Sequence, residues 1–118
     1  MNENLAAEIV RMTDEDQRMR RKMQAVHEEL SAVDARNTRR LREVIAEIGW
    51  PTRSKVGEQA EHLAWLLVQH ADRDLSFQRE CLALMEAESA DEVCPKHLAY
   101  LVDRIRLAEG RPLRSLFG

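Results

Sequence analysis

Aromatic residues are scarce in this sequence, at 4% of 118 residues, and so are glycine and proline, with four and three copies. Sheets draw on aromatic and β-branched residues, and hairpins need glycine and proline at their turns. The composition therefore argues against a β-sandwich or a β-barrel. The two cysteines, Cys81 and Cys94, are too few and too far apart for a disulfide framework or a thiolate zinc site.

Long apolar runs and an excess of basic residues are also lacking. No run approaches the roughly 18 apolar residues of a membrane-spanning helix, so we expect no membrane partner. The net charge is -3 and the pI is about 5.8, so we expect no nucleic-acid partner. The first residues, 1–4, have neither the basic nor the apolar region of a signal peptide, which predicts a cytoplasmic protein.

Apolar residues at helical spacing are what the sequence does contain, within a hydrophobic fraction of 44%. A chain of this length is long enough for one core and too short for two. We therefore predict an all-α fold, a single compact bundle of about five helices with a short C-terminal tail, as one domain over residues 1–118. The first helix has a stripe in which spacings of four and three residues alternate. This stripe consists of Leu5, Ile9, Met12, Asp16, Met19, Met23, Val26 and Leu30.

Capping residues and breakers place the other four predicted helices, at about 35–48, 55–71, 75–89 and 95–110. Gly49 and Gly110 serve as C-terminal stops, and Asp74 is placed to cap the fourth helix. Residues expected to face inward on the last three helices are Val56, Ala60, Leu63, Ala64 and Leu67, then Leu75, Gln78, Leu82 and Met85, then Leu98, Leu101, Val102 and Ile105.

Four polar residues fall on these apolar stripes, namely Asp16, Asn37, His70 and Gln78. A lone buried carboxylate costs several kcal/mol, so such groups must be paired, protonated or solvated. If the stripes converge, the four side chains form an interior polar cavity, where helical bundles build ligand sites. The alternative is a structural network in which they bond to one another or to backbone groups near helix ends.

Asp16 and His70 are the chemically interesting pair, because a carboxylate fixes the tautomer of an imidazole and raises its basicity. No serine or cysteine is presented to them, so a nucleophilic triad is not indicated. A metal held by His70 with Asp16 or Asp74 would have too few ligands, and we predict none. Asp103 and Arg104 lie about a hundred degrees off the inward stripe of the last helix, where a surface ion pair is the default.

Several segments resemble a family of small bacterial proteins, frequent in actinobacteria, that is known as DUF6624. The resemblance covers about residues 16–110 and has no established reaction attached. Its tail pattern, an aromatic-Gly-Thr-Gln run, departs from Leu116-Phe117-Gly118 here, which puts a site that needs those residues in doubt. The matching elements are Asp16-Gln17, Asn37, the segment from Gly49 to Gly57, Gln69 to Asp72, Phe77-Gln78, and Ala99 to Arg104.

The leading hypothesis is a small-molecule site inside the bundle, in which Asp16 and His70 act as an acid–base pair. The resemblance adds Gln17, Gln69, Tyr100, Asp103 and Arg104 to Asn37 and Gln78 as ligand-binding candidates. Any cofactor is left unknown by the sequence. The alternative is an interaction module in which the methionine-bearing first helix binds a partner helix or forms a homodimer, and the inward polar residues are a structural network.

Overall fold

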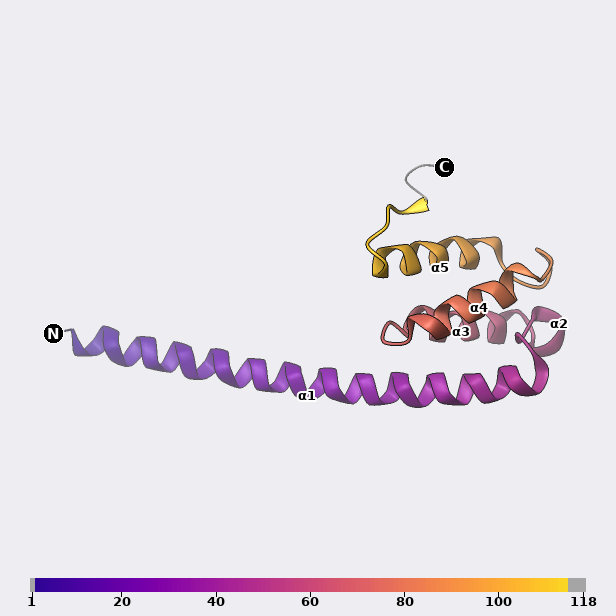
Figure 1. Cartoon of the computed structure of the whole chain (residues 1–118). Helices are drawn as coiled ribbons and strands as arrows, with labels where there is room; N and C mark the ends of the chain where they lie inside the picture. The colour runs from indigo at the N-terminus through magenta and orange to yellow at the C-terminus, as the bar shows by residue number, and fades with distance from the viewer. Residues whose placement is uncertain (1, 115–118) are drawn as a thin grey trace. The chain divides into compact units, whose positions relative to one another are not determined.

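The structure is a computed structural model that describes residues 2–114. Within these residues it contains five α-helices and no strand, which confirms the predicted all-α class (Figure 1). None of the described helices is long and apolar enough to cross a membrane. The helices are α1 (Glu3–Ile48), α2 (Arg53–Val56), α3 (Glu58–Gln69), α4 (Leu75–Glu86) and α5 (Pro95–Ala108).

The number of helices agrees with the prediction, but their boundaries differ at two places. The first predicted helix, which carries the stripe from Leu5 to Leu30, and the helix predicted at about 35–48 are one continuous helix, α1, because residues 31–34 include no glycine or proline to stop it. The helix predicted at 55–71 is instead divided at Gly57, whose φ of +91° lies in the region that favours glycine. The short α2 therefore precedes α3 as a separate element.

The chain divides into two units, residues 1–33 and 34–118. Taken by itself, the described part of the first unit is one stretch of α1, and all of its residues from 2 to 30 are exposed. A single helix has no second element against which to bury an apolar stripe. The seven apolar stripe residues between Leu5 and Leu30, expected to face a core, are between 53% and 68% exposed.

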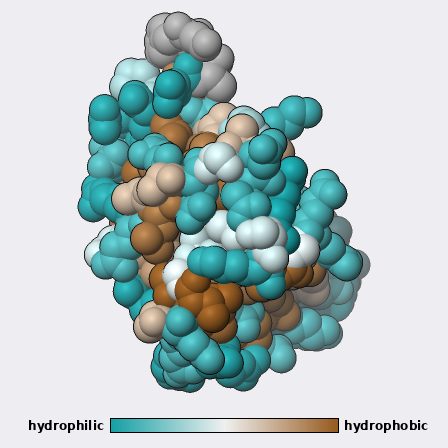
Figure 2. All heavy atoms as spheres, turned by 90° about the vertical axis from the view of Figure 1, so that its right-hand side faces the viewer, coloured by the Kyte–Doolittle hydropathy of each residue, from teal (hydrophilic) through white to brown (hydrophobic). Residues whose placement is uncertain are grey.

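The second unit has a hydrophobic core between α3, α4 and α5, which lie side by side in Figure 1. Five of its twelve members come from α4 and α5, and three of these, Met85, Leu101 and Ile105, were predicted to face inward. Hydrophobic atoms also remain open among hydrophilic ones on the face drawn in Figure 2. The buried core residues are Leu41, Trp50, Ala64, Trp65, Val68, Ala71, Phe77, Cys81, Met85, Val93, Leu101 and Ile105.

The stripe predicted for the third helix is rotated from the face that α3 buries. Leu63 and Leu67 are 48% and 40% exposed, whereas Trp65 and Val68 are buried. The large ring of Trp65 is buried together with Val68, three positions further along the helix, and this pair decides which side faces the core. His70, expected to follow Leu63 and Leu67 inward, is correspondingly exposed.

The turn after α1 fixes the start of the segment that forms the candidate site. Gly49 has a φ of +76°, and the Lys55 ammonium donates to the Ile48 carbonyl at the C-terminus of α1. The Arg53 backbone N–H donates to the Glu92 carbonyl at 3.1 Å, which joins this turn to the loop before α5. Asp74 accepts a hydrogen bond from the Phe77 backbone N–H, which confirms it as the cap of α4.

Candidate functional site

A buried glutamate and a buried histidine form a pair between α3 and α5. Glu61 is 1% exposed and His97 is 8% exposed, and Oε1 of the carboxyl group lies 3.2 Å from the histidine Nδ1. The second oxygen, Oε2, accepts a hydrogen bond from the Trp50 indole at 3.4 Å. A buried carboxyl group is tolerated when it is paired in this way.

His62 extends this pair toward the surface. Its Nδ1 lies 3.0 Å from Nε2 of His97, and its own side chain is exposed. The Trp65 ring stacks on the His97 ring, with centroids 4.3 Å apart and planes at 5°, which holds the imidazole in one orientation. We call Glu61, His97 and His62 the histidine relay, because they form an unbroken chain of polar contacts from the core to an exposed ring.

Local sequence explains why these side chains meet. Pro95 is at the start of α5, a position that tolerates its missing N–H, and it places His97 in the first turn. Glu61 lies in the first turn of α3, where the N-terminal end of the helix favours an acidic side chain. The neighbours Glu61 and His62 point in different directions around α3, and both reach His97.

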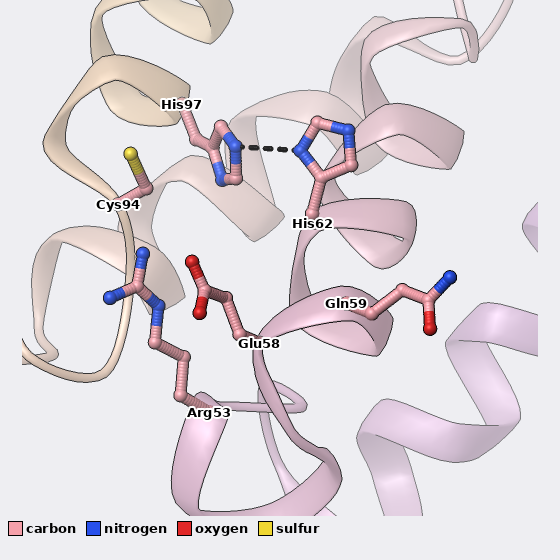
Figure 3. Close-up of a pocket in the computed structure, with 6 residues that line it drawn as sticks. All are labelled: Arg53, Glu58, Gln59, His62, Cys94 and His97. Carbon is pink, nitrogen blue, oxygen red and sulfur yellow. Dashed lines mark hydrogen bonds between the residues drawn. The ribbon is translucent and has the colours of Figure 1, made fainter.

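A pocket of about 520 Å³ adjoins the relay (Figure 3). The picture shows Arg53 and Glu58 extending toward His97 and Cys94, while Gln59 points away from them. The buried Nε of Arg53 has no hydrogen-bond partner among residues 2–114. The pocket therefore offers charges of both signs, a thiol and an imidazole pair. Its lining residues are Arg53, Glu58, Gln59, His62, Cys94 and His97.

The electrostatics of the relay favour a neutral imidazole at its centre. Burial lowers the pKa of His97 below its usual value of 6.5, although the nearby Glu61 carboxyl acts in the opposite direction. His97 is therefore mostly uncharged near pH 7. Within residues 2–114, no group of three or more histidine, cysteine, aspartate or glutamate side chains is arranged to hold a metal ion.

The two cysteines, Cys81 and Cys94, differ in how accessible their thiols are. Cys81 is fully buried in the core, and its burial raises the pKa of its thiol to about 12. Cys94 is half-buried and lies at the pocket. Both are free thiols, so the difference between them is one of access.

Some residues predicted from the sequence gather elsewhere in the second unit, around Asp72. Both Asp72 carboxyl oxygens accept from the Arg104 guanidinium, with Nε at 2.8 Å, so this ion pair is bidentate. The Gln78 amide nitrogen lies 3.4 Å from Asp72 and donates to the Val68 carbonyl at 3.1 Å. We call Gln69, Asp72, Gln78 and Arg104 the Asp72 cluster.

Two amide oxygens in the Asp72 cluster have no hydrogen-bond partner among residues 2–114. Gln69 donates to the Tyr100 carbonyl at 3.3 Å, but its Oε1 and that of Gln78 are buried without a hydrogen bond among the described residues. Buried unpaired acceptors are costly and uncommon. Asp72, the bidentate partner of Arg104, lies beside Gln78, so one of these unpaired oxygens belongs to a neighbour of the ion pair.

The remaining predicted residues lie apart from these contacts. Asp16 and Gln17 are exposed in the first unit, where the Asp16 carboxyl pairs with Arg20 at 2.9 Å. Asn37 is half-buried on α1. The pairing of Asp16 with His70 would join the two units and stays a prediction, as does the single domain over 1–118. In the second unit, His70 and Tyr100 are exposed, and Asp103 accepts from the Arg114 backbone N–H.

The relay residues were missed by the sequence prediction, although a signal for two of them exists. Glu61 precedes Ala64, Trp65 and Val68 by three, four and seven positions, so it lies on the face that α3 buries. His97 likewise precedes Leu101 and Ile105 by four and eight positions. Placing the inward stripe of α3 on Trp65 rather than on Leu63 would have shown an acidic residue on the buried face.

These features define a class: an all-α protein with a buried glutamate–histidine pair that continues to an exposed histidine beside a pocket. The sequence model that describes a family of unknown function, DUF6624, matches residues 3–117. The chain belongs to this family. No curated protein and no solved structure matches the chain.

Proposed function

We propose that this protein binds a small polar molecule in the pocket between α2, α3 and α5 and exchanges a proton with it at His62. The observation that carries this proposal is the histidine relay, in which Glu61, His97 and His62 follow one another at 3.2 Å and 3.0 Å. The expected small-molecule site with acid–base chemistry is retained, but with these residues in place of Asp16 and His70.

The donor and acceptor roles of the three side chains set the direction of the histidine relay. The Glu61 carboxylate is an acceptor, so Nδ1 of His97 carries the hydrogen of their contact. Neutral His97 then has a lone pair on Nε2, which accepts from Nδ1–H of His62. Nε2 of His62 is left with a lone pair. It can take a proton from an O–H or N–H group of a ligand, whose bonding electrons stay on the ligand.

The two buried members position the exposed one. When His62 takes up a proton, the added charge is stabilised through His97 by the carboxylate of Glu61. The lowered pKa of His97 preserves the lone pair on which this arrangement depends. Trp65 and Trp50 hold the two buried groups by stacking and by hydrogen bonding. A purely structural network would have no need to end on an exposed imidazole beside a pocket.

The pocket restricts the ligand to small molecules with polar groups. Its volume of about 520 Å³ lies in the range of small-molecule sites. Arg53, whose Nε lacks a partner, is suited to an acidic or carbonyl oxygen of the ligand, and Glu58 to a hydrogen-bond donor. The pocket thus favours a molecule that carries both kinds of group.

The Asp72 cluster is a second location for the same kind of function. Its unpaired Gln69 and Gln78 oxygens could accept hydrogen bonds from a ligand, and His70 would be the nearby acid–base group. His70 is close enough to Asp72 that its charge lowers the pKa of that carboxyl group, although Arg104 is the larger cause. Substituting His62 or His70 separates the two locations, because His62 belongs to the histidine relay and His70 lies near the Asp72 cluster.

The experiment is a binding screen followed by ¹H–¹⁵N chemical shifts, with a panel of carboxylic acids, phosphate esters, amino acids and amides. We expect hits to shift the amides of Arg53, His62 and Cys94. His62→Gln should weaken a hit at least tenfold, which corresponds to about 1.4 kcal/mol. His70→Gln, a matched change on an exposed histidine, should leave it unchanged.

Three outcomes would count against the relay. Loss of binding in His70→Gln with binding retained in His62→Gln would move the site to the Asp72 cluster. Shifts confined to residues outside both locations, or no binding from the whole panel at millimolar concentration, would remove support for a small-molecule site. Circular dichroism of both variants checks that each is folded.

A further inference from the structure

The stripe on α1 has the spacing of a coiled coil. Leu5, Ile9, Met12 and the following stripe residues alternate by four and three positions, which is a seven-residue repeat, and Val33 and Asn37 continue it. From Leu5 to Leu30, its seven apolar members are 53% to 68% exposed. A repeat sustained over more than four heptads is longer than packing against one short helix requires.

We propose that α1 binds α1 of a second copy of this chain in a two-stranded antiparallel coiled coil. In this arrangement Met23 lies opposite Val26 of the second copy, and Met19 lies opposite Leu30 of the second copy. The two-fold symmetry repeats each contact. The centre of the seam then consists of leucine, valine and methionine side chains, and toward each end Asp16 lies opposite Val33 of the second copy and Met12 lies opposite Asn37 of the second copy.

Charge complementarity selects the antiparallel orientation and its register. Six charged residues, one heptad apart, flank the seam on one side, and the central four are Glu15, Lys22, Glu29 and Arg36. The outer two are Glu8 and Glu43, and Glu43 is paired with Arg40 of the same helix. With Met23 opposite Val26, Glu15 faces Arg36 of the second copy and Lys22 faces Glu29 of the second copy, so all these pairs are attractive. None of the four forms an ion pair within residues 2–114, which leaves them available.

A parallel, in-register pair is disfavoured by contacts between like charges. It would place Asp16 against Asp16 of the second copy inside the seam, and Glu29 against Asp34 of the second copy at its edge. Like charges in these positions are repulsive. In the antiparallel register, Asp16 instead lies opposite Val33 of the second copy and keeps its own partner, Arg20, at 2.9 Å on the same helix.

The first test measures the mass of the full-length protein in solution by sedimentation velocity from 1 to 200 µM. We expect a dimer whose dissociation constant rises at least tenfold in Val26→Asp. The matched control is Val10→Asp, because Val10 is 59% exposed, close to the 56% of Val26, but lies off the stripe. Val10→Asp should dimerise like the parent protein. A parent that is monomeric at 200 µM, or an equal loss in both variants, overturns the proposal.

The second test addresses orientation. Arg36→Glu should weaken the dimer at least threefold, and adding Glu15→Arg should restore it, because the two residues face each other only in the antiparallel register. Failure of the double variant to recover overturns that register. A stripe that is covered by the chain's own second unit would give a monomer in every variant, and circular dichroism verifies that the variants are helical.

Discussion

Helix α1 and helices α4 and α5 carry similar apolar spacing but differ in what the structure does with it. On α4 and α5, Met85, Leu101 and Ile105 are buried in the core of the second unit. On α1, Met19 and Leu30 are 56% and 59% exposed. The difference teaches that periodicity identifies the apolar face of a helix without identifying what covers it.

The polar residues on these faces differ in the same way. Gln78 on α4 is fully buried and donates to the Val68 carbonyl, so its amide nitrogen is satisfied inside the unit. Asp16 on α1 is exposed and pairs with Arg20 one turn away. A polar residue on a stripe is therefore evidence for an interior site only after its helix has been shown to pack. The following predictions test this contrast.

The largest difference should come from matched leucines. Leu101→Ala removes a side chain that is fully buried on α5, and we expect a loss of about 2 to 5 kcal/mol in the free energy of unfolding. Leu30→Ala should cost less than about 1 kcal/mol, because that side chain is already 59% exposed. Urea unfolding at protein concentrations low enough to keep the chain monomeric makes the comparison. Equal losses would show that the α1 stripe is buried within the monomer.

A pH effect should arise in the second unit from His97. Its pKa is lowered in the folded protein, so the unfolded chain takes up a proton near pH 6.5 while the folded chain does not. The free energy of unfolding should fall as pH is lowered from about 7.5 toward 5.5, by at most about 1.4 kcal/mol per pH unit. His97→Gln should remove this part of the slope.

Asp72 and Asp74 affect stability at a lower pH than His97 does, so their carboxyl groups do not contribute to the slope measured between about pH 7.5 and 5.5. Hydrogen bonds from Arg104 lower the pKa of Asp72, and the contacts of Asp74 with Arg42 and Phe77 lower its pKa against the opposing effect of burial. Their stabilisation is lost as pH falls below their usual value of 3.8. His27→Gln, on α1, is the matched control. An unchanged slope in His97→Gln would contradict a buried neutral imidazole.

Local signals predicted much of the second unit correctly. The cap at Asp74, the stops at Gly49 and Gly110 and the inward faces of α4 and α5 follow from residues whose effect depends on their nearest neighbours. The continuity of α1 through residues 31–34 was missed, although these residues include no glycine or proline and the apolar spacing continues to Val33. The rotation of α3 was missed because leucine spacing outweighed Trp65, the larger side chain.

The candidate site was harder to predict because it depends on contacts between distant segments. Glu61 and His97 are 36 positions apart, and nothing near either residue identifies its partner. The predicted residues Gln69, Gln78 and Arg104 do come together around Asp72, but through an ion pair between Asp72 and Arg104 that was not predicted, because Arg104 was expected to form a surface ion pair with its neighbour Asp103. The resemblance supplied residue identities without the geometry that distinguishes a ligand site from a structural network.

The smallest effects should come from a matched pair of aspartates. Asp74→Ala removes the cap of α4 and the partner of Arg42, which lies 3.0 Å away, and should cost about 1 kcal/mol of unfolding free energy. Asp16→Ala removes only an exposed pair within α1 and should cost less than about 0.5 kcal/mol in the monomer. Thermal unfolding of the two variants at low protein concentration measures this difference. If Asp16→Ala were the more costly change, its carboxyl group would have to be buried in the folded monomer, and an interior site that includes Asp16 would regain support.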